Sequence, residues 1–239
     1  MVSFVRRVER SRGVALDLYE ALKHLMRGLP VSGWGVADIT GIPGNRTGFT
    51  RAISMYRAHD LAAQHDPLRG GSYSEEAFHA AELEAQRDVR AAVEGVRSML
   101  EREGIACRVP ARGQDPQTLV GEFSHKLAAT RAGLGWIGRS SLLVTRVHGP
   151  RVVLHSVLLD AAIPAAEPVT GHRCGSCVAC VEACPYGFVR GPAWESGMDR
   201  DLLLDAHGCS EKRVEIGEPL GRKHECGLCM LLCPLGSRL

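Results

Sequence analysis

Apolar residues recur every three to four positions between Ser74 and Glu103, and this is the strongest local pattern in the chain. An apolar stripe with this spacing, with Glu and Arg on the opposite face, is typical of an amphipathic helix. Gly104 follows at the position where such a helix ends. The stripe consists of Phe78, Ala81, Ala85, Val89, Ala92, Val93, Val96 and Leu100. The pattern therefore predicts a long structural helix that packs on a core.

Shorter patterns predict two more helices and five strands. The helices are expected over 17–26 and 123–132. The strands are expected over 35–40, 51–56, 105–109, 141–145 and 151–159. Because a turn signal, His148-Gly149-Pro150, separates the last two strands, we expect them to form a hairpin. This mixture of elements predicts an α/β (α+β) fold class for the first part of the chain.

Composition and charge narrow the classes of protein that the chain can represent. Of its 239 residues, 29 are Lys or Arg and 27 are Asp or Glu, so a formal net charge of +2 gives no nucleic-acid signature. No apolar run approaches the length of about 18 residues that a transmembrane helix needs. The N-terminal residues become charged at once, unlike a secretory signal. We therefore expect a cytoplasmic chain that does not contact a membrane.

Cysteines are concentrated in the last quarter of the sequence. Cys107 stands alone, whereas the other eight of the nine cysteines lie between Cys174 and Cys233. A secreted disulfide scaffold would distribute its cysteines along a small chain, so this concentration favours metal ligation in a reducing compartment. The segment 161–169, with two prolines, is typical of a linker. We expect two domains, an α/β domain over 1–168 and a cysteine-rich module over 169–239.

The spacing of the eight cysteines is that of a double iron–sulfur module. The first run has the spacing C-x₂-C-x₂-C-x₃-C-P of bacterial ferredoxins, and the second run repeats its final portion. In this pattern the last cysteine of each run crosses over to the other cluster. We predict one [4Fe–4S] cluster on Cys174, Cys177, Cys180 and Cys233, and a second on Cys184, Cys209, Cys226 and Cys229.

Two structural Cys₄ zinc sites are the alternative use of the same eight cysteines. Zinc ribbons pair two C-x₂-C knuckles across a longer loop and do not need a tight triplet followed by Cys-Pro. The spacing therefore favours iron–sulfur clusters. Two adjacent clusters conduct single electrons, so we expect the remainder of the chain to hold an electron acceptor.

The segment 131–144, Arg-Ala-Gly-Leu-Gly-Trp-Ile-Gly-Arg-Ser-Ser-Leu-Leu-Val, resembles the epoxyqueuosine reductase family. The resemblance continues through Leu158-Leu159-Asp160 and the cysteine-rich module, and it covers 123–234. Members of that family bind cobalamin between a nitroreductase-like α/β domain and a ferredoxin-like module with two [4Fe–4S] clusters, and reductive dehalogenases share this architecture. The resemblance implies the same two parts here, with a corrinoid (cobalamin) between them.

The same resemblance marks candidate cofactor-binding residues. They are Gly133, Leu134, Gly135, Trp136, Gly138 and Ser140. The glycines lack side chains, so their backbone amides could approach a large flat ligand, and Trp136 could cover an apolar face of it. The alternative is that the glycines and Trp136 form a tight turn between a helix and a strand.

The chain departs from the family in two respects. Epoxyqueuosine reductases carry a catalytic Asp shortly before the Ala-Gly-Leu-Gly stretch, whereas 119–126 contains no Asp. Glu122 is the nearest carboxylate, and His125 and Lys126 are two further candidate proton donors, so we take these three as candidate catalytic residues; solvated or capping roles are the alternative. Full-sized members also carry helical repeats after the clusters that help to hold tRNA, and this short form ends six residues after Cys233.

We therefore expect an iron–sulfur oxidoreductase that passes electrons through two [4Fe–4S] clusters to a corrinoid, which it reduces together with a small-molecule substrate, unless the corrinoid is itself the substrate. The alternatives are an epoxyqueuosine reductase acting on tRNA, and a plain ferredoxin-type electron carrier for a partner enzyme. The charge balance argues against tRNA. A low-potential electron donor, ferredoxin or flavodoxin, is the expected partner. A set of basic residues is its candidate docking patch, with a solvated loop as the alternative: Lys212, Arg213, Arg222 and Lys223.

Overall fold

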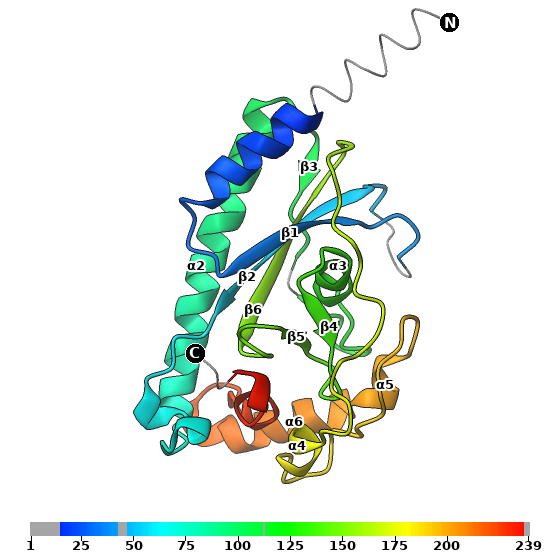
Figure 1. Cartoon of the computed structure of the whole chain (residues 1–239). Coiled ribbons are helices and arrows are strands. Elements are labelled where there is room, and N and C mark those ends of the chain that lie inside the picture. The colour runs from blue at the N-terminus through cyan, green and yellow to red at the C-terminus, as the bar shows by residue number, and fades with distance from the viewer. Residues whose placement is uncertain (1–14, 43–46, 112, 237–239) are drawn as a thin grey trace, which may run out of the picture.

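A four-stranded antiparallel sheet lies at the centre of the computed structural model, which describes residues 15–42, 47–111 and 113–236 (Figure 1). The strands follow the order β1-β2-β6-β3 across the sheet. They are β1 (Gly33–Asp38), β2 (Arg51–Ala58), β6 (Val152–Leu159) and β3 (Cys107–Arg108). The two long central strands are buried over almost every residue, which is expected for strands that are covered on both faces.

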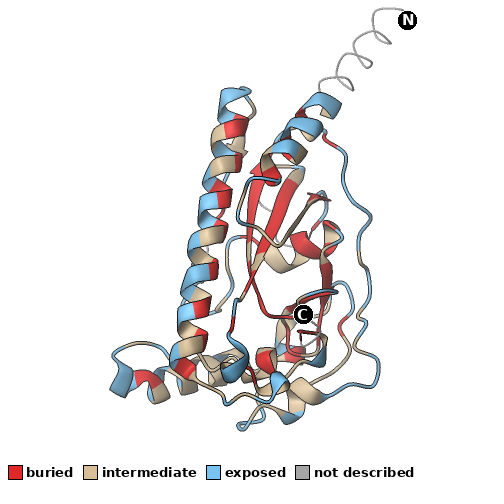
Figure 2. Cartoon of the chain, turned by 60° about the vertical axis from the view of Figure 1, so that its left-hand side comes forward, coloured by how far each residue is buried: buried red, intermediate tan, exposed pale blue. Residues whose placement is uncertain are grey.

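One face of the sheet packs against α2 (Glu75–Arg102) and the helix over 15–26. The side chain of Ser74 accepts a hydrogen bond from the backbone N–H of Ala77 and so caps the start of α2. All eight residues of the predicted apolar stripe are buried, along the side of the helix that faces the sheet in Figure 2. Gly104, with a φ of 68°, follows the end of the helix, so the predicted boundaries are confirmed to within a residue.

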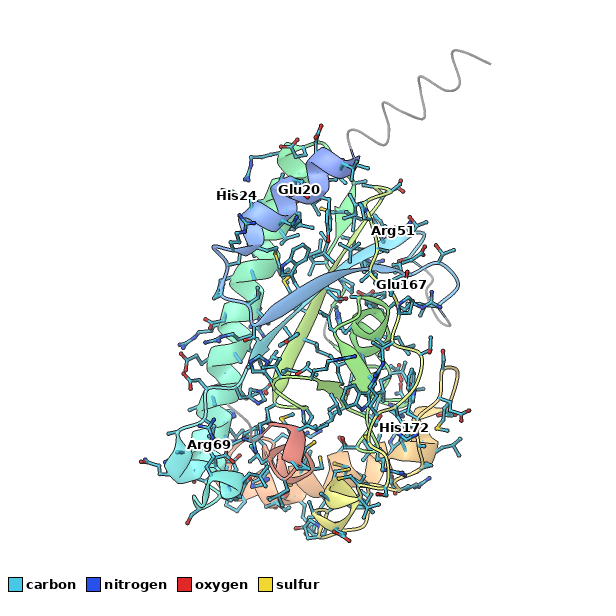
Figure 3. The ribbon with its side chains drawn as sticks, in the orientation of Figure 1. Glu20, His24, Arg51, Arg69, Glu167 and His172 are labelled. Atoms are coloured by element: carbon cyan, nitrogen blue, oxygen red, sulfur yellow. The ribbon has the colours of Figure 1, made fainter. Side chains whose placement is uncertain are left out.

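The other face packs against α3 (His125–Arg131), which lies within the predicted 123–132 segment. Ala128 and Ala132 meet Ala37 and Ala52 there, and these small side chains let the helix lie close to the strands. The chain from residue 160 then runs back along α3, where the N–H of Val169 donates to the carbonyl of Thr130. Glu167 and His172 mark this connection in Figure 3.

The hairpin expected from 141–145 and 151–159 is wrong. The strand β5 (Leu143–Thr145) pairs with β4 (Gly135–Ile137) in a separate two-stranded sheet. A tight turn follows β5, because Thr145 and Gly149 form an isolated bridge. The chain then continues into β6, which pairs along its full length with β2. This long pairing buries the apolar residues of β6 on both faces, which a hairpin with the three-residue β5 would not do.

The cysteine-rich part lies at one end of the central sheet, at the bottom of Figure 1. Its described residues include the α-helices α4 (Ala179–Glu182), α5 (Arg200–Leu203), α6 (Ala206–Gly217) and α7 (Leu228–Leu231). The expected mixed α/β architecture is confirmed, whereas the nitroreductase-like and ferredoxin-like descriptions and the boundary after 168 stay predictions. Among the described helices, none combines the length and the apolar character needed to cross a membrane.

Candidate functional site

The first three cysteines of the first run and the last cysteine of the chain line one cavity of about 150 Å³. Cys174, Cys177 and Cys180 come from the turn before α4 and from α4 itself, and Cys233 follows α7. The turn is tight, because the N–H of Cys177 donates to the carbonyl of Cys174 and Gly175 has a φ of 55°. The structure thus brings together the four residues predicted to hold the first cluster. We call this space the first cysteine cavity.

A second cavity, of about 280 Å³, is lined by Cys184, Cys209, Cys226 and Cys229. Cys209 lies in α6 and Cys229 in α7, and we call this space the second cysteine cavity. Cys229 and Ser140 border both cysteine cavities, so the two spaces adjoin each other. The two groups of four cysteines are those of the predicted crossover; which of them ligate iron stays a prediction.

The raised pKa values of two partly buried cysteine thiols are those expected where thiolates bind a cationic group. Burial and then the neighbouring cysteines Cys174, Cys233 and Cys177 raise the pKa of Cys180 to about 11. Burial and the cysteines of the second group, with Cys180, raise the pKa of Cys229 to about 12. Thiols with pKa values as high as those of Cys180 and Cys229 stay protonated at neutral pH unless a cation binds the thiolates. Each group is therefore suited to a metal centre.

The size of the two cavities favours clusters over single ions. A zinc ion draws four sulfurs to about 2.3 Å from one point, which leaves no space between them. Cavities of about 150 and 280 Å³ leave that space, as an iron–sulfur cube requires. Over the described residues, no group of three or more His, Cys, Asp and Glu is arranged to hold a single metal ion. The residues present fit two [4Fe–4S] clusters.

A third cavity, of about 510 Å³, adjoins the second cysteine cavity. It lies among α3, the start of β6, the loop over 113–121, and the helices α5 and α7. Glu82, Leu142 and Met230 border both this cavity and the second cysteine cavity. The three cavities therefore follow one another in a row, and we call this last one the reaction cavity.

Two of the three candidate catalytic residues line the reaction cavity. The Nζ atom of Lys126 donates to the backbone carbonyl of Ser141 at 2.6 Å, and burial, followed by the charge of Arg200, lowers the pKa of Lys126 to about 8. The Nδ1 atom of His125 lies 3.1 Å from the hydroxyl of Ser156. A lysine with a pKa near neutrality exchanges protons readily under ordinary conditions.

Glu122, the third candidate, lies outside the residues that line the reaction cavity. Its carboxylate is exposed, pairs with Arg108 at 2.5 Å and accepts a hydrogen bond from the N–H of Ala111 at 2.6 Å. These contacts connect β3 to the segment before α3. The structure gives Glu122 a structural pairing and does not bring it together with His125 and Lys126 at the cavity.

Three of the six candidate cofactor-binding residues lie in the turn after α3 and at the start of β4, outside the lining of the reaction cavity. Gly133, with a φ of 72°, ends α3, and the N–H of Leu134 donates to the carbonyl of Ala129. Gly135 lies buried in β4, where a Cβ atom would overlap the backbone carbonyl of Val144. None of these three residues lines the reaction cavity. The positive φ therefore accounts for Gly133 and close packing for Gly135, and their role toward a cofactor stays a prediction.

The remaining three cofactor candidates face the first cysteine cavity. Gly138 and Ser140 line it, and Ser140 also borders the second cysteine cavity. The indole Nε1 atom of Trp136 lies 3.5 Å from the Sγ atom of Cys174. The motif 131–144 thus reaches both sites, because three other of its residues line the reaction cavity: Ile137, Ser141 and Leu142.

Sequence reasoning missed two charged residues at the reaction cavity, Glu82 and Arg200. Arg200, at the start of α5, donates to the carbonyls of Leu119 and Thr118 and so holds the loop over 113–121 at the cavity. Glu82, in α2, lies 2.7 Å from the Nε2 atom of His59. Both residues belong to ordinary charged helix surfaces in the sequence, so no local signal distinguishes them.

The candidate docking patch is largely neutralised by nearby groups. Arg222 pairs with Glu75 at the start of α2, and Arg213 pairs with Glu225. Lys212 pairs with Glu215, while Lys223 donates to the hydroxyl of Ser210. These contacts support the solvated-loop alternative, with Arg222 serving to join the cysteine-rich part to α2.

Comparison with known proteins connects this geometry to one family. Residues 173–236 match the family described as the 4Fe-4S double cluster binding domain. The epoxyqueuosine reductase of Alicycliphilus denitrificans is 32% identical over 136 residues, a match that covers 48% of this chain and 35% of that protein. The enzyme of Escherichia coli is 34% identical over 116 residues, covering 44% and 28%. The resemblance to epoxyqueuosine reductases is confirmed.

Solved structures share the fold over most of this chain. An epoxyqueuosine reductase gives a TM-score of 0.61 at 17% identity, covering 94% of this chain and 67% of that one. The enzyme from Bacillus subtilis, described with an aspartate catalytic loop swung out of its active site, gives 0.59 at 17% identity over 93% and 66%. A catabolic reductive dehalogenase gives 0.65 at 20% identity over 91% and 31%. The matched segments span about a third of the length of the curated relatives.

Proposed function

We propose that this chain is an iron–sulfur reductase whose two [4Fe–4S] clusters deliver electrons one at a time to the reaction cavity. The observation that carries the proposal is the row of three adjoining cavities, two of which are lined by the two predicted groups of four cysteines. Clusters in adjacent cavities conduct single electrons in sequence. A plain electron carrier would not need the third cavity, so the arrangement favours an enzyme.

The exposure of Cys177, and the residues that the second cysteine cavity shares with the reaction cavity, indicate the direction of electron flow. Cys177 in the first cysteine cavity is exposed, whereas the second cysteine cavity shares Leu142 and Met230 with the reaction cavity. The first cluster therefore receives electrons from a low-potential donor, ferredoxin or flavodoxin, and the second cluster passes them to the cavity. The donor binds near Cys177 in this proposal, away from the neutralised basic loop.

The group expected at the reaction cavity is a corrinoid. The cavity wall includes Phe123, Leu154 and Trp194, which suit a large apolar ring face, while Lys126 and Arg200 suit its polar substituents. The fold supports this choice, because a similar reductive dehalogenase is described with a mechanism for B12-dependent dehalogenation. A bound corrinoid supplies a strongly reducing metal centre, and the protein supplies position, exclusion of water and protons.

Lys126 is the proton donor in this proposal. Its ammonium group is fixed by the carbonyl of Ser141 and its pKa of about 8 keeps it protonated at neutral pH, yet able to release the proton. His125, held by Ser156, lies beside it and can supply a second proton. These two residues take the place of the aspartate that is absent from 119–126.

Epoxyqueuosine is the substrate that the relatives favour. Both curated relatives named above are epoxyqueuosine reductases, and this supports the alternative from the sequence better than the free corrinoid or small molecule that the sequence analysis put first. One similar structure contains an epoxyqueuosine-modified tRNA stem loop, with a TM-score of 0.58 at 16% identity, so tRNA returns as a candidate partner despite the charge balance. Reductive removal of an epoxide oxygen consumes two electrons and two protons and releases water, which two clusters and two proton donors can supply.

The test uses the anaerobically reconstituted chain, cobalamin, titanium(III) citrate and an epoxyqueuosine-containing anticodon stem loop. We expect loss of one oxygen from the modified base by mass spectrometry, only when cobalamin is present. Lys126→Gln should lose this turnover while it keeps its iron, and Lys23→Gln, at a partly exposed lysine on the helix over 15–26, should not. An unchanged cobalamin absorption spectrum would refute corrinoid binding. Cobalamin binding with an untouched stem loop would refute epoxyqueuosine and favour a small substrate.

A further inference from the structure

We infer that Trp136 tunes the reduction potential of the first cluster through a hydrogen bond from its indole N–H to the sulfur of Cys174. The inference rests on the two-cluster assignment within the proposed function, and it is independent of which substrate is reduced. Trp136 belongs to the motif 131–144 that resembled a cofactor-binding segment. Its position in the structure assigns it to the cluster instead.

The contact is buried and chemically specific. The Nε1 atom of Trp136 lies 3.5 Å from the Sγ atom of Cys174, and Trp136 is 3% exposed. An indole N–H can only donate, so a buried indole requires an acceptor. A thiolate that ligates iron is a stronger acceptor than a neutral thiol, because the acceptor is charged. The indole is therefore better satisfied when the cluster is present.

The backbone around Trp136 fixes this contact from both sides. Trp136 pairs with Val144 across the β4–β5 ladder, and the N–H of Gly138 donates to the carbonyl of Leu142 to close the turn. A Cβ atom on Gly138 would lie 3.6 Å from the sulfur of Cys174 and would press on the side chain of Val144. Glycine at 138 thus makes room for Val144, the residue that pairs with Trp136, beside the sulfur of Cys174.

Arg139 fixes the turn that carries Cys174. Its Nη2 atom donates to the carbonyl of Gly175 at 2.8 Å, and its Nη1 atom donates to the carbonyl of Gly191. Gly175 follows Cys174 directly, so the guanidinium fixes the turn that carries the first ligand. The motif 131–144 therefore supplies both the indole donor of Trp136 and the guanidinium of Arg139, which fixes the turn after Cys174.

A donor at this position favours the reduced cluster. Reduction adds one negative charge, part of which resides on the cysteine sulfurs, and the positive end of the indole N–H dipole stabilises that charge. The interaction is strengthened because the indole that donates it is buried. Removal of the N–H should therefore lower the reduction potential of the first cluster and leave the second cluster unchanged.

The test is a redox titration of Trp136→Phe and Trp194→Phe, followed by EPR. Trp194 is the matched control, because it is also 3% exposed and lines the reaction cavity rather than the first cysteine cavity. We expect one of the two clusters of Trp136→Phe to shift, so that its reduced-to-oxidised ratio at a fixed solution potential falls about threefold to tenfold, a tenfold change being about 59 mV. Unchanged potentials at full iron content, or an equal shift in Trp194→Phe, would overturn the inference.

A second measurement covers the case in which Trp136→Phe loses iron. The unsubstituted chain is labelled with nitrogen-15 in its tryptophan indoles, reduced, and examined by pulsed EPR. A nitrogen coupling to the reduced cluster is expected, and its absence would overturn the inference. Failure to reduce epoxyqueuosine would leave the coupling and the shift intact, so the two proposals fail separately.

Discussion

Lys126 places an ammonium group at the reaction cavity, and its protonation should set the pH dependence of turnover. Burial, and then the positive charge of Arg200, lowers the pKa of Lys126 to about 8. If Lys126 donates a proton, turnover should decline as the pH rises above about 8. Lys126→Gln should reduce turnover by about 100-fold or more, as expected for loss of a general acid. A pH–rate profile checks both points; a substituted chain with the same alkaline decline would exclude Lys126 as its cause.

The same pKa shift predicts how stability depends on pH. Below about pH 8 both the folded and the unfolded chain hold the proton of Lys126, so its burial lowers the free energy of unfolding by a constant amount. Between about 8 and the ordinary value of 10.5 the folded chain releases the proton first, so stability rises with pH. Lys126→Met should be more stable below pH 8 and should lack this rise. Urea unfolding of both proteins across this range provides the measurement.

Asp66 and Arg151 form a buried ion pair that supports the end of the chain near Cys233. The Nη1 atom of Arg151 lies 2.5 Å from the carboxylate of Asp66, and its Nη2 atom donates to the carbonyl of Leu231 at 2.5 Å. Burial, the largest single influence, would raise the pKa of Asp66, but the hydrogen bonds from Arg151 and from the backbone N–H of Leu68, with the charges of Arg151 and Arg69, together outweigh it and lower the pKa below 3.8. The stabilisation is therefore present at neutral pH and is lost only as the pH falls through that lowered value.

Asp66→Asn should lower the free energy of unfolding by about 3–5 kcal/mol, because it leaves the guanidinium of Arg151 buried without its counterion. Denaturant unfolding at neutral pH checks this value. Asp88→Asn is the matched control, since Asp88 pairs with Arg57 at 2.8 Å but both side chains are partly exposed, and it should cost less than about 1 kcal/mol. Equal losses in the two variants would contradict the role of burial.

At the scale of elements, the β4–β5 ladder requires glycine at position 135. A Cβ atom there would overlap the backbone carbonyl of Val144, in a segment where neither strand can move without disturbing its pairing. Gly135→Ala should therefore cost about 1–3 kcal/mol and lower the melting temperature. Gly171→Ala should be nearly neutral, because no atom lies within 4 Å of its Cβ position. If Gly135→Ala keeps its melting temperature but loses cobalamin affinity, the glycine serves the cofactor instead.

The sequence predicted those elements whose signals are local. A stripe of eight apolar residues indicates α2, and the ferredoxin-type spacing of the cysteines indicates the two groups that line the cysteine cavities. The predicted hairpin is wrong because β6 pairs with β2, about a hundred residues away along the chain. A local turn signal cannot show that a distant strand is the better pairing partner. Arg200 and Glu82 reach the reaction cavity from separate helices, so only the folded chain reveals them.

At the scale of the whole molecule, ion pairs and hydrogen bonds from the sheet region hold the cysteine-rich part in place. Arg151 bonds the carbonyl of Leu231, and Glu75 at the start of α2 pairs with Arg222 and accepts from the N–H of Glu225. These contacts cross the boundary predicted after 168. They fix the cysteines relative to the reaction cavity, which electron transfer over a defined path requires.

The crossover of ligands is the property of the whole chain that a simple measurement can test. Two cubanes contain about eight irons, and loss of one ligand should destroy one cluster and leave about four. Cys233 lies in the first cysteine cavity although it ends the second run, and Cys184 lies in the second cysteine cavity although it ends the first run. Cys233→Ser should therefore damage the first cluster and Cys184→Ser the second.

The two variants are distinguished by the cluster that Trp136 contacts. Cys184→Ser should keep the EPR signal whose potential depends on Trp136, because Cys174 and its cluster remain, whereas Cys233→Ser should lose that signal. Cys107→Ala should keep all eight irons, since Cys107 lies in β3 and packs against the core of the sheet. Loss of the Trp136-dependent signal in Cys184→Ser would mean that each run holds its own cluster. The row of cavities would then require a different assignment of the cluster that faces the reaction cavity.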